Sequence, residues 1–303
     1  GAIELLPLGY DEETKIFTRE GGVEYATDWP VERGRAFLQE LHAEFPFAKD
    51  EGRSEAVATA AMLTVYAPLL ISPLAPRPAF IYLANSEGSG KTLLAQLAGA
   101  AQGIVPVSSA PKSEEEWDKK ILATVISGAS LMLIDNVKGC LNSSALEGVL
   151  TSPKYEGRVL GSSQIYRGDA NHVVLITGND LTVSPDLCRR ALFVELFSEA
   201  LRAEDRTFKR VLDAAEILRL QPQILAALWS LISEWDRKGR PVGTITNASF
   251  PRWASTFGGI METAGYTSPC ARHEIEGMVD PDIADMLKLT QLIVPDKAYS
   301  FAD

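Results

Sequence analysis

One segment of this chain has the order of features that a phosphate-binding loop requires. An apolar run at residues 79–84 leads into Asn85-Ser86-Glu87-Gly88-Ser89-Gly90-Lys91-Thr92, and a helical pattern runs from Thr92 to Ala101. A glycine-rich turn between a buried strand and a helix points several backbone N–H groups inward, where they bind phosphate oxygens. The helix N-terminus adds partial positive charge at the same place. The segment therefore predicts the strand–loop–helix unit of an α/β protein that binds a phosphorylated ligand.

The residue types in this loop indicate ATP and Mg²⁺ as the ligands. We expect Lys91 to contact the β- and γ-phosphates and the Thr92 hydroxyl to bind Mg²⁺. The residues expected to contact the nucleotide are Asn85, Ser86, Glu87, Gly88, Ser89, Gly90, Lys91, Thr92 and Leu93. The usual pattern has glycine in place of Asn85, and asparagine tolerates the left-handed backbone that we expect there. The alternative is an ordinary Ser/Gly turn before a helix.

A second apolar run, at residues 131–136, ends in an acidic residue. This pattern predicts a buried parallel strand that delivers Asp135 to its carboxyl end, the edge at which open α/β sheets bind ligands. We expect Asp135 to hold Mg²⁺ directly or through water. Many P-loop ATPases have glutamate next, whereas this chain has Asn136. An amide orients a water molecule but does not take its proton, so either another group does so or hydrolysis is slow.

A third apolar run, at residues 172–179, ends in Asn179. We expect Asn179 to lie at the same sheet edge and to position the attacking water or contact the γ-phosphate, although it is also a typical residue to begin a turn. Arg189 and Arg190 precede a further apolar run at residues 191–196. They are candidates for an arginine finger that reaches a phosphate across a subunit boundary. The alternative is two solvated arginines beside a strand.

Four motifs in this order resemble the helicase-like ATPase domain of phage, plasmid and other mobile-element primase/helicase proteins, which is related to superfamily-3 helicases within the AAA+ ATPases. They are the loop at 85–92, Leu-Ile-Asp-Asn-Val-Lys-Gly at 133–139, Ile-Thr-Gly-Asn at 176–179 and Asp-Leu-Cys-Arg-Arg at 186–190. Segments 145–152, 158–163 and 204–208 also resemble that group. The resemblance covers residues 50–265.

This resemblance implies a function and a set of partners. It implies an ATP-hydrolysing, ring-forming helicase or DNA translocase of a phage or mobile-element replication protein, with Asn179 as the sensor residue and Arg190, with Arg189 beside it, as the finger. We expect copies of the chain to assemble into a homo-oligomeric ring, a hexamer. We expect this ring to bind single-stranded or forked DNA. A hairpin before the sensor strand would grip DNA, with Arg158, Gln164, Arg167 and His172 as candidates. A plain surface hairpin with a packed His172 is the alternative.

Composition limits the class of protein. The chain has 303 residues, of which 46% are hydrophobic and 23% charged, as expected for a water-soluble globular chain. Its net charge of −11 weighs against a generic nucleic-acid binder, but a ring helicase needs positive charge only in its channel. The three cysteines and three histidines do not have metal-ligand spacing. No apolar run is long enough to span a membrane, so we expect a cytoplasmic protein.

The pattern of apolar residues and turns divides the chain into four parts. We expect a hairpin lead-in at 1–28, with a turn at 9–12 and a strand at 15–19; a helical region at 29–75; a P-loop AAA+ core of parallel sheet and helices at 76–200; and a C-terminal helical region with an acidic tail at 201–303. Helices are predicted at 30–45, 54–70, 113–127, 142–150, 205–220 and 222–237, with Pro222 opening the last. Two extended runs flank a predicted turn at 167–170, and residues 244–266 form a possible lid.

Two other functions fit the same loop. A nucleotide-controlled assembly or defence protein would hydrolyse ATP slowly and unwind nothing, and Asn136 and the acidic charge favour it. A nucleotide kinase would need a basic lid and an acceptor pocket, for which the sequence gives no signal.

Overall fold

The computed structural model describes residues 3, 5, 9–12, 16–18, 22–159, 161, 164–198 and 212–271. The motif at 204–208, the first part of the helix expected at 205–220 and nearly all of the acidic tail lie outside the described residues.

A parallel sheet forms the centre of the protein. Its strand order is β4-β5-β8-β3-β9, and each neighbouring pair is parallel. The strands are β3 (Ala79–Ala84), β4 (Val107–Ser109), β5 (Leu131–Leu141), β8 (Val173–Val183) and β9 (Ala191–Leu196). Parallel neighbours require crossover connections, and the intervening helices supply them. The predicted α/β class, a parallel sheet flanked by helices, is therefore confirmed.

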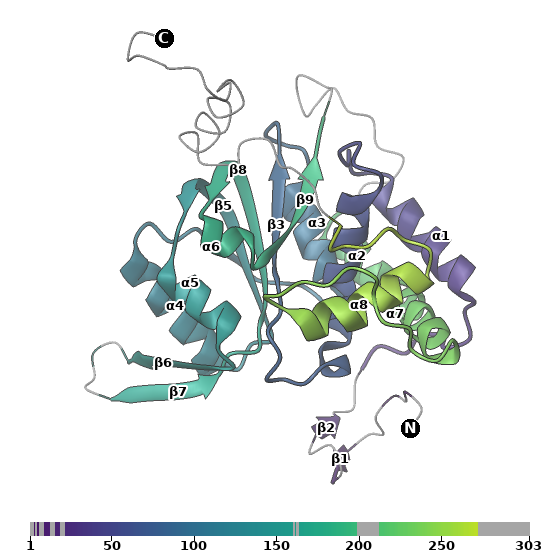
Figure 1. Ribbon diagram of the computed structural model, residues 1–303, viewed down its shortest axis with the longest axis horizontal. Helices are drawn as coiled ribbons and strands as arrows, with labels where there is room; N and C mark the ends of the chain where they lie inside the picture. The colour runs from purple at the N-terminus through teal and green to yellow at the C-terminus, as the bar shows by residue number, and fades with distance from the viewer. Residues whose placement is uncertain are drawn as a thin grey trace, which may run out of the picture.

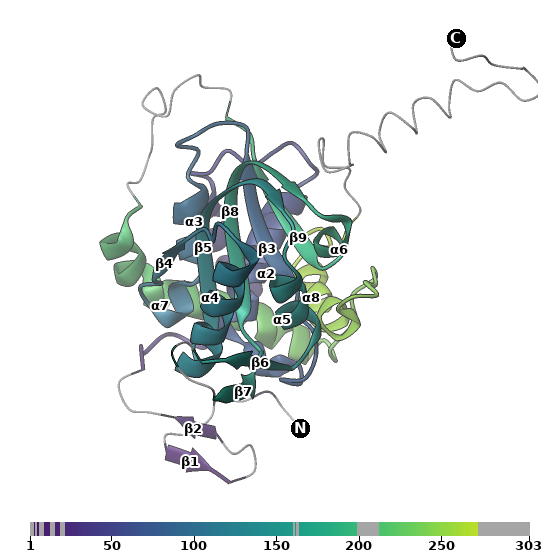
Figure 2. The ribbon, with the colours of Figure 1, turned by 90° about the vertical axis from the view of Figure 1, so that its left-hand side faces the viewer.

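Both faces of the sheet are covered, because its strands are apolar on both sides. Along β3, Phe80 and Tyr82 pack into one core and Ala79 and Ile81 into the other. The first core is shared with α1 (Val31–His42), α2 (Arg53–Tyr66), α3 (Lys91–Ala98), α7 (Ala214–Arg237) and α8 (Pro251–Thr263). The second is shared with α4 (Glu114–Ser127) and α5 (Ser144–Thr151). Figures 1 and 2 show these two layers of helices on opposite sides of the sheet.

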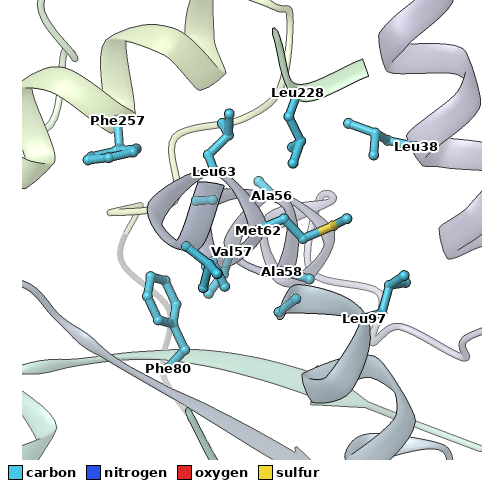
Figure 3. Packing of buried hydrophobic residues seen from close by; sticks show 14 of the residues in the cluster. Leu38, Ala56, Val57, Ala58, Met62, Leu63, Phe80, Leu97, Leu228 and Phe257 are labelled. Atoms are coloured by element: carbon cyan, nitrogen blue, oxygen red, sulfur yellow. The ribbon is translucent and has the colours of Figure 1, made fainter. Parts of the chain in front are cut away.

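Helix α2 is the centre of the larger core. Its small side chains allow neighbouring elements to approach closely on several sides, and Ala56, Ala60 and Ala61 are fully buried. Around it pack Leu38 of α1, Phe80 of β3, Leu97 of α3, Leu228 of α7 and Phe257 of α8 (Figure 3). The helices before and after the glycine-rich loop are thus parts of one core.

The helices predicted at 113–127 and 142–150 are confirmed as α4 and α5. The Ser113 hydroxyl accepts a hydrogen bond from the Glu116 backbone N–H at 3.3 Å, and α4 ends at Gly128, whose φ is 66°. Helix α5 begins after Ser143, whose hydroxyl accepts from Leu146 N–H at 3.2 Å. Short 3₁₀ turns, Pro68–Leu70 and Ala100–Gln102, take up the ends of the helices predicted to reach Leu70 and Ala101.

The prediction that Pro222 begins a helix is wrong. Helix α7 runs continuously from Ala214 to Arg237, with Pro222 inside it. A proline inside a helix removes one backbone hydrogen bond and costs about 3 kcal/mol. Here the carbonyl that loses its partner belongs to Leu218, which is partly exposed, while the apolar stripe continues buried through Leu220 and Ile224. Burial of that stripe on both sides of the proline outweighs the lost bond.

The predicted turn at 167–170 is also wrong. The hairpin consists of β6 (Lys154–Arg158) and β7 (Ile165–Asp169), with Arg158 opposite Ile165, so its turn lies between those two residues. Gly168, part of the misleading turn signal, lies in β7 against α4. A Cβ atom there would be 2.5 Å from Val125 Cγ1. The glycine is required for close packing rather than for a turn.

Two further expectations need correction, and one strand was not predicted. Residues 244–266 do not form a lid, because Trp253 of α8 is fully buried and its Nε1 donates to Thr64 Oγ1 at 2.9 Å. The turn expected at 9–12 is a strand instead, β1 (Gly9–Asp11), paired with β2 (Ile16–Thr18). The sequence analysis missed β4, whose three residues are too few to show a pattern.

Among the described helices, none has both the length and the apolar character needed to cross a lipid bilayer.

Candidate nucleotide-binding site

The loop between β3 and α3 has the backbone shape that phosphate binding needs. Gly88 and Gly90 have φ values of 70° and 95°, the left-handed region that glycine adopts without strain. A Cβ atom on Gly90 would also lie 3.2 Å from the Phe45 ring. Helix α3 begins at Lys91, so its first N–H groups face the loop. The described residues therefore form a cradle of backbone donors at a helix N-terminus, which fits a polyphosphate.

Asn85 has a different role from the predicted one. Among the described residues other than glycine, only Glu51, Asn136 and Arg240 have positive φ, so Asn85 is not left-handed. Its side-chain amide bonds to the backbone of Ser198 in both directions: Nδ2 donates to Ser198 O at 3.0 Å, and Oδ1 accepts from Ser198 N at 2.9 Å. Asn85 therefore fastens the start of the loop to the chain that follows β9.

Lys91 lies inside the loop. Its side chain is buried, and Nζ donates to the backbone oxygen of Ser86 at 3.2 Å. The Ser89 hydroxyl donates to the same oxygen. A buried ammonium is strongly stabilised by an anion, and the loop amides surround the place where one would bind. This arrangement fits the predicted contact between Lys91 and the phosphates of a nucleotide.

Beneath the loop, Asp135 accepts two hydroxyl hydrogen bonds. Its Oδ1 accepts from Thr92 Oγ1 and from Thr177 Oγ1, both at 2.6 Å. The structure thus brings together Thr92 and Asp135, the two residues predicted to bind Mg²⁺. Within the described residues, no group of three or more His, Cys, Asp or Glu could hold a metal without other ligands. Oxygen donors beside a phosphate cradle fit Mg²⁺, which usually binds through few protein groups, waters and phosphates.

Thr177 is a site residue that the sequence analysis missed. Besides donating to Asp135, its hydroxyl accepts from the Asn136 backbone N–H at 3.0 Å, and the side chain is buried. Residues two apart in a strand point to the same face, so the expected position of Asn179 at the sheet edge could have identified Thr177 as a polar residue facing the same site.

Asn136 occupies a bulge in β5. The register of β5 against β8 shifts between Ile134 and Val137, and Asn136 has a φ of 61°. Asparagine adopts this left-handed conformation more readily than glutamate. The Asn136 side-chain oxygen accepts from Asn179 Nδ2 at 3.4 Å. The Asn179 Oδ1 atom is buried and has no hydrogen-bond partner among the described residues, as expected of a group available to a ligand or a water.

A hollow of about 410 Å³ adjoins the loop on this side. Its lining includes Ser86 and Glu87 from the loop, Asn179 from β8, and Lys138 and Gly139 from β5. Lys138 belongs to the Asp-Asn-Val-Lys-Gly motif, but the sequence analysis gave it no role. The extension of β5 beyond Asn136, which sequence patterning did not predict, is what places Lys138 here.

The structure does not bring Arg189 and Arg190 to this site. Ala191 at the start of β9 is opposite Ala79 at the start of β3, and the loop follows the other end of β3, six residues later. At about 3.3 Å per residue, Arg190 is on the order of 20 Å from the loop of its own chain. Arg190 Nη1 donates to the Asp186 backbone oxygen at 2.8 Å, and Arg189 pairs with the Asp186 carboxylate. A role for either arginine at a phosphate therefore requires a second subunit.

The candidate DNA-contacting residues lie at three different places. Arg158 and Gln164 flank the hairpin turn. Arg167 faces the Glu156 carboxylate across the hairpin and forms an ion pair with it. His172 lies beyond the hairpin and is buried, with Nδ1 against the Ala129 backbone oxygen. Burial lowers the pKa of His172, so the ring gains no positive charge near neutral pH. His172 is a packing residue, and its prediction as a DNA contact is wrong.

No protein-family model matches the chain, and no curated protein matches it. Among solved structures, two apo structures of the NrS-1 C-terminal region are 14% and 13% identical, with TM-scores of 0.42 and 0.46. They cover 74% of this chain, which spans 53% and 52% of theirs. JCV helicase is 15% identical, with a TM-score of 0.33, covering 77% of this chain and 65% of its own.

The chain thus spans about half the length of the NrS-1 structures that it matches. One of these similar structures is a helicase. Because these TM-scores are below 0.5, they add no weight to a functional assignment. That assignment depends on the geometry of the site.

Proposed function

We propose that this chain binds ATP with Mg²⁺ and hydrolyses it as the motor domain of a ring-forming DNA helicase or translocase in phage or mobile-element replication. The observation that carries the proposal is the hydrogen-bonded group Thr92–Asp135–Thr177 directly beneath a glycine-rich loop that holds the buried Lys91. A surface Ser/Gly turn needs neither a buried lysine nor a carboxylate beneath it.

Each residue of the site has a role that follows from its position. Lys91 and the loop N–H groups bind phosphate oxygens, and Thr92 and Asp135 provide oxygen ligands for a metal. Bound ATP and Mg²⁺ supply the phosphoanhydride bond and the charge that neutralises its phosphates. Thr177 fixes the orientation of the Asp135 carboxylate. Asn179, whose Oδ1 lacks a partner in the part of the chain that the structure describes, orients the attacking water.

The proposed ring follows from the position of Arg190. Since Arg190 is at the far end of the sheet from its own loop, it stabilises developing phosphoryl charge only in a neighbouring subunit. The β6–β7 hairpin projects from the same end of the sheet, below α4 and α5 in Figure 1. In the proposal it contacts DNA through Arg158, Gln164 and Arg167.

Asn136 favours a second candidate function. In place of the carboxylate that activates water in many P-loop ATPases, this chain has an amide in a left-handed bulge. A protein in which ATP binding controls assembly, with slow hydrolysis and no unwinding, would have such a site. ATP turnover measured with and without single-stranded DNA separates the two functions, with Lys91→Ala as the inactive control. The helicase proposal expects DNA to stimulate turnover.

A further inference from the structure

Lys138 lies in one row with the sensor residue and the start of the nucleotide loop. Ala84 of β3 is paired with Asn179 of β8. On the other side of β8, Lys138 of β5 lies between the pairs Val137–Gly178 and Gly139–Leu181. Neighbouring strands are about 4.8 Å apart, so the Lys138 backbone is two strand spacings, on the order of 10 Å, from that of Ala84. A lysine side chain spans most of such a gap.

Two left-handed residues keep this part of β5 at the rim of the site. Asn136 and Gly139, with φ values of 61° and 73°, flank Val137 and Lys138, and the register against β8 shifts twice in this stretch. Val137 is buried in the core, whereas Lys138 is exposed and lines the hollow beside Ser86 and Asn179. The bulge thus places Lys138 on the hollow beside the loop.

A phosphate bound in the hollow would need a cation beside it to offset the negative charge nearby. Glu87 also lines it and carries a negative charge that would repel a phosphate. Asn136 and Asn179 are neutral, and Arg190 of the same chain is at the far end of the sheet. Lys91 is on the inner side of the loop, at Ser86 O. Of the described side chains that line the hollow, Lys138 is the cation.

We propose that Lys138 contacts the terminal phosphate of a bound nucleoside triphosphate from within the same subunit, so that the site distinguishes triphosphate from diphosphate. This inference rests on the proposed function of the loop. A diphosphate fills the cradle around Lys91 and the α3 N-terminus but leaves the Lys138 side of the hollow empty. The contribution of Lys138 is therefore made to the triphosphate alone.

The test compares the affinities of the full chain for ADP and for a non-hydrolysable ATP analogue, AMP-PNP, by calorimetry with excess Mg²⁺. A hydrogen-bonded ammonium–phosphate contact corresponds to roughly a tenfold or larger change in affinity. We expect Lys138→Ala to weaken AMP-PNP binding by about that factor and to change ADP binding by less than about twofold. Lys138→Arg should keep most of the selectivity. Lys119→Ala, which removes an exposed lysine paired with Glu115 on α4, is the matched control.

The outcomes separate this inference from the proposed function. Equal losses for both nucleotides would mean that Lys138 shapes the loop, and unchanged affinities would mean that it touches no phosphate. Either result overturns the inference while leaving nucleotide binding intact. Failure of the folded wild-type chain to bind either nucleotide would overturn the proposed function itself, and this inference with it.

Discussion

Single residues determine the geometry of this site. The Asp135 carboxylate and the two hydroxyls that donate to it are the clearest example. Thr92 and Thr177 both donate to one oxygen of Asp135, and the Thr177 hydroxyl also accepts from the Asn136 backbone. The positions of Lys91, Thr92 and Asp135 were predictable because each is at a fixed offset from an apolar strand. Thr177 was missed although it shares a strand face with Asn179, and Lys138 was not predictable, because its position depends on a bulge that tertiary pairing creates.

Asn136 is the residue whose conformation the sequence least predicted. Asparagine was expected to be left-handed in the loop, at Asn85, and the structure instead places the left-handed asparagine in β5. Asn85 is held by hydrogen bonds to Ser198, a residue that is distant in sequence and therefore not readable from the loop alone.

Replacing Asn136 tests this assignment. The positive φ at Asn136 strains an alanine but not a glycine. We expect the free energy of unfolding of Asn136→Ala to be about 1 kcal/mol lower than that of Asn136→Gly. In an ordinary strand position the alanine variant would be the more stable of the two. Denaturant unfolding of the two variants measures the difference. If the alanine variant were the more stable, residue 136 would not be left-handed.

At the scale of elements, apolar periodicity predicted the strands and helices that carry the site, whereas single glycine and proline residues were misleading. Strands β3 and β9 and the capped helix α4 agree with the predictions. Gly168 and Pro222 were each interpreted as a break, yet Gly168 packs against Val125 and Pro222 is inside α7. In both cases packing against a distant element determines the structure, which a local pattern does not contain.

Pro222 provides a prediction at this scale. Since α7 continues through the proline, Pro222→Ala should restore a helical hydrogen bond to the Leu218 carbonyl and raise the stability by about 1–3 kcal/mol. The gain is reduced by the greater freedom of the unfolded chain. Thermal unfolding measures it, with Leu218→Ala as a control that leaves the backbone bond unchanged. A lower melting temperature for Pro222→Ala would show that the helix breaks at this residue.

For the whole molecule, the candidate functional residues lie at two opposite ends of the sheet. The loop, the Asp135 group and Lys138 are at the carboxyl end of the strands, while Arg190 and the β6–β7 hairpin are at the other. In the proposed function, one subunit contributes its nucleotide site at one end and Arg190 as a finger at the other, so that the arrangement would be complete only in an assembly. The sequence indicated the finger, but only the strand register shows that it does not reach its own loop.

Mixing two inactive variants tests this arrangement. Lys91→Ala and Arg190→Ala should each lack ATPase activity, and a mixed assembly contains some interfaces with both residues intact, so part of the activity should return. Arg189→Ala, whose side chain pairs with Asp186 at the surface, is the parallel variant that identifies which arginine matters. Mixed assemblies that form but remain inactive would show that Arg190 has only a structural role.

The central claim is that the loop around Lys91 hydrolyses ATP, and steady-state ATP turnover tests it most directly. Loss of the Lys91 cation from the phosphate site should reduce turnover roughly a hundredfold or more, while the circular dichroism spectrum of Lys91→Ala stays that of the wild type. The account predicts Mg²⁺-dependent turnover by the wild-type chain, stimulated by single-stranded DNA and absent in this variant. A folded Lys91→Ala protein that hydrolyses ATP at the wild-type rate would contradict it.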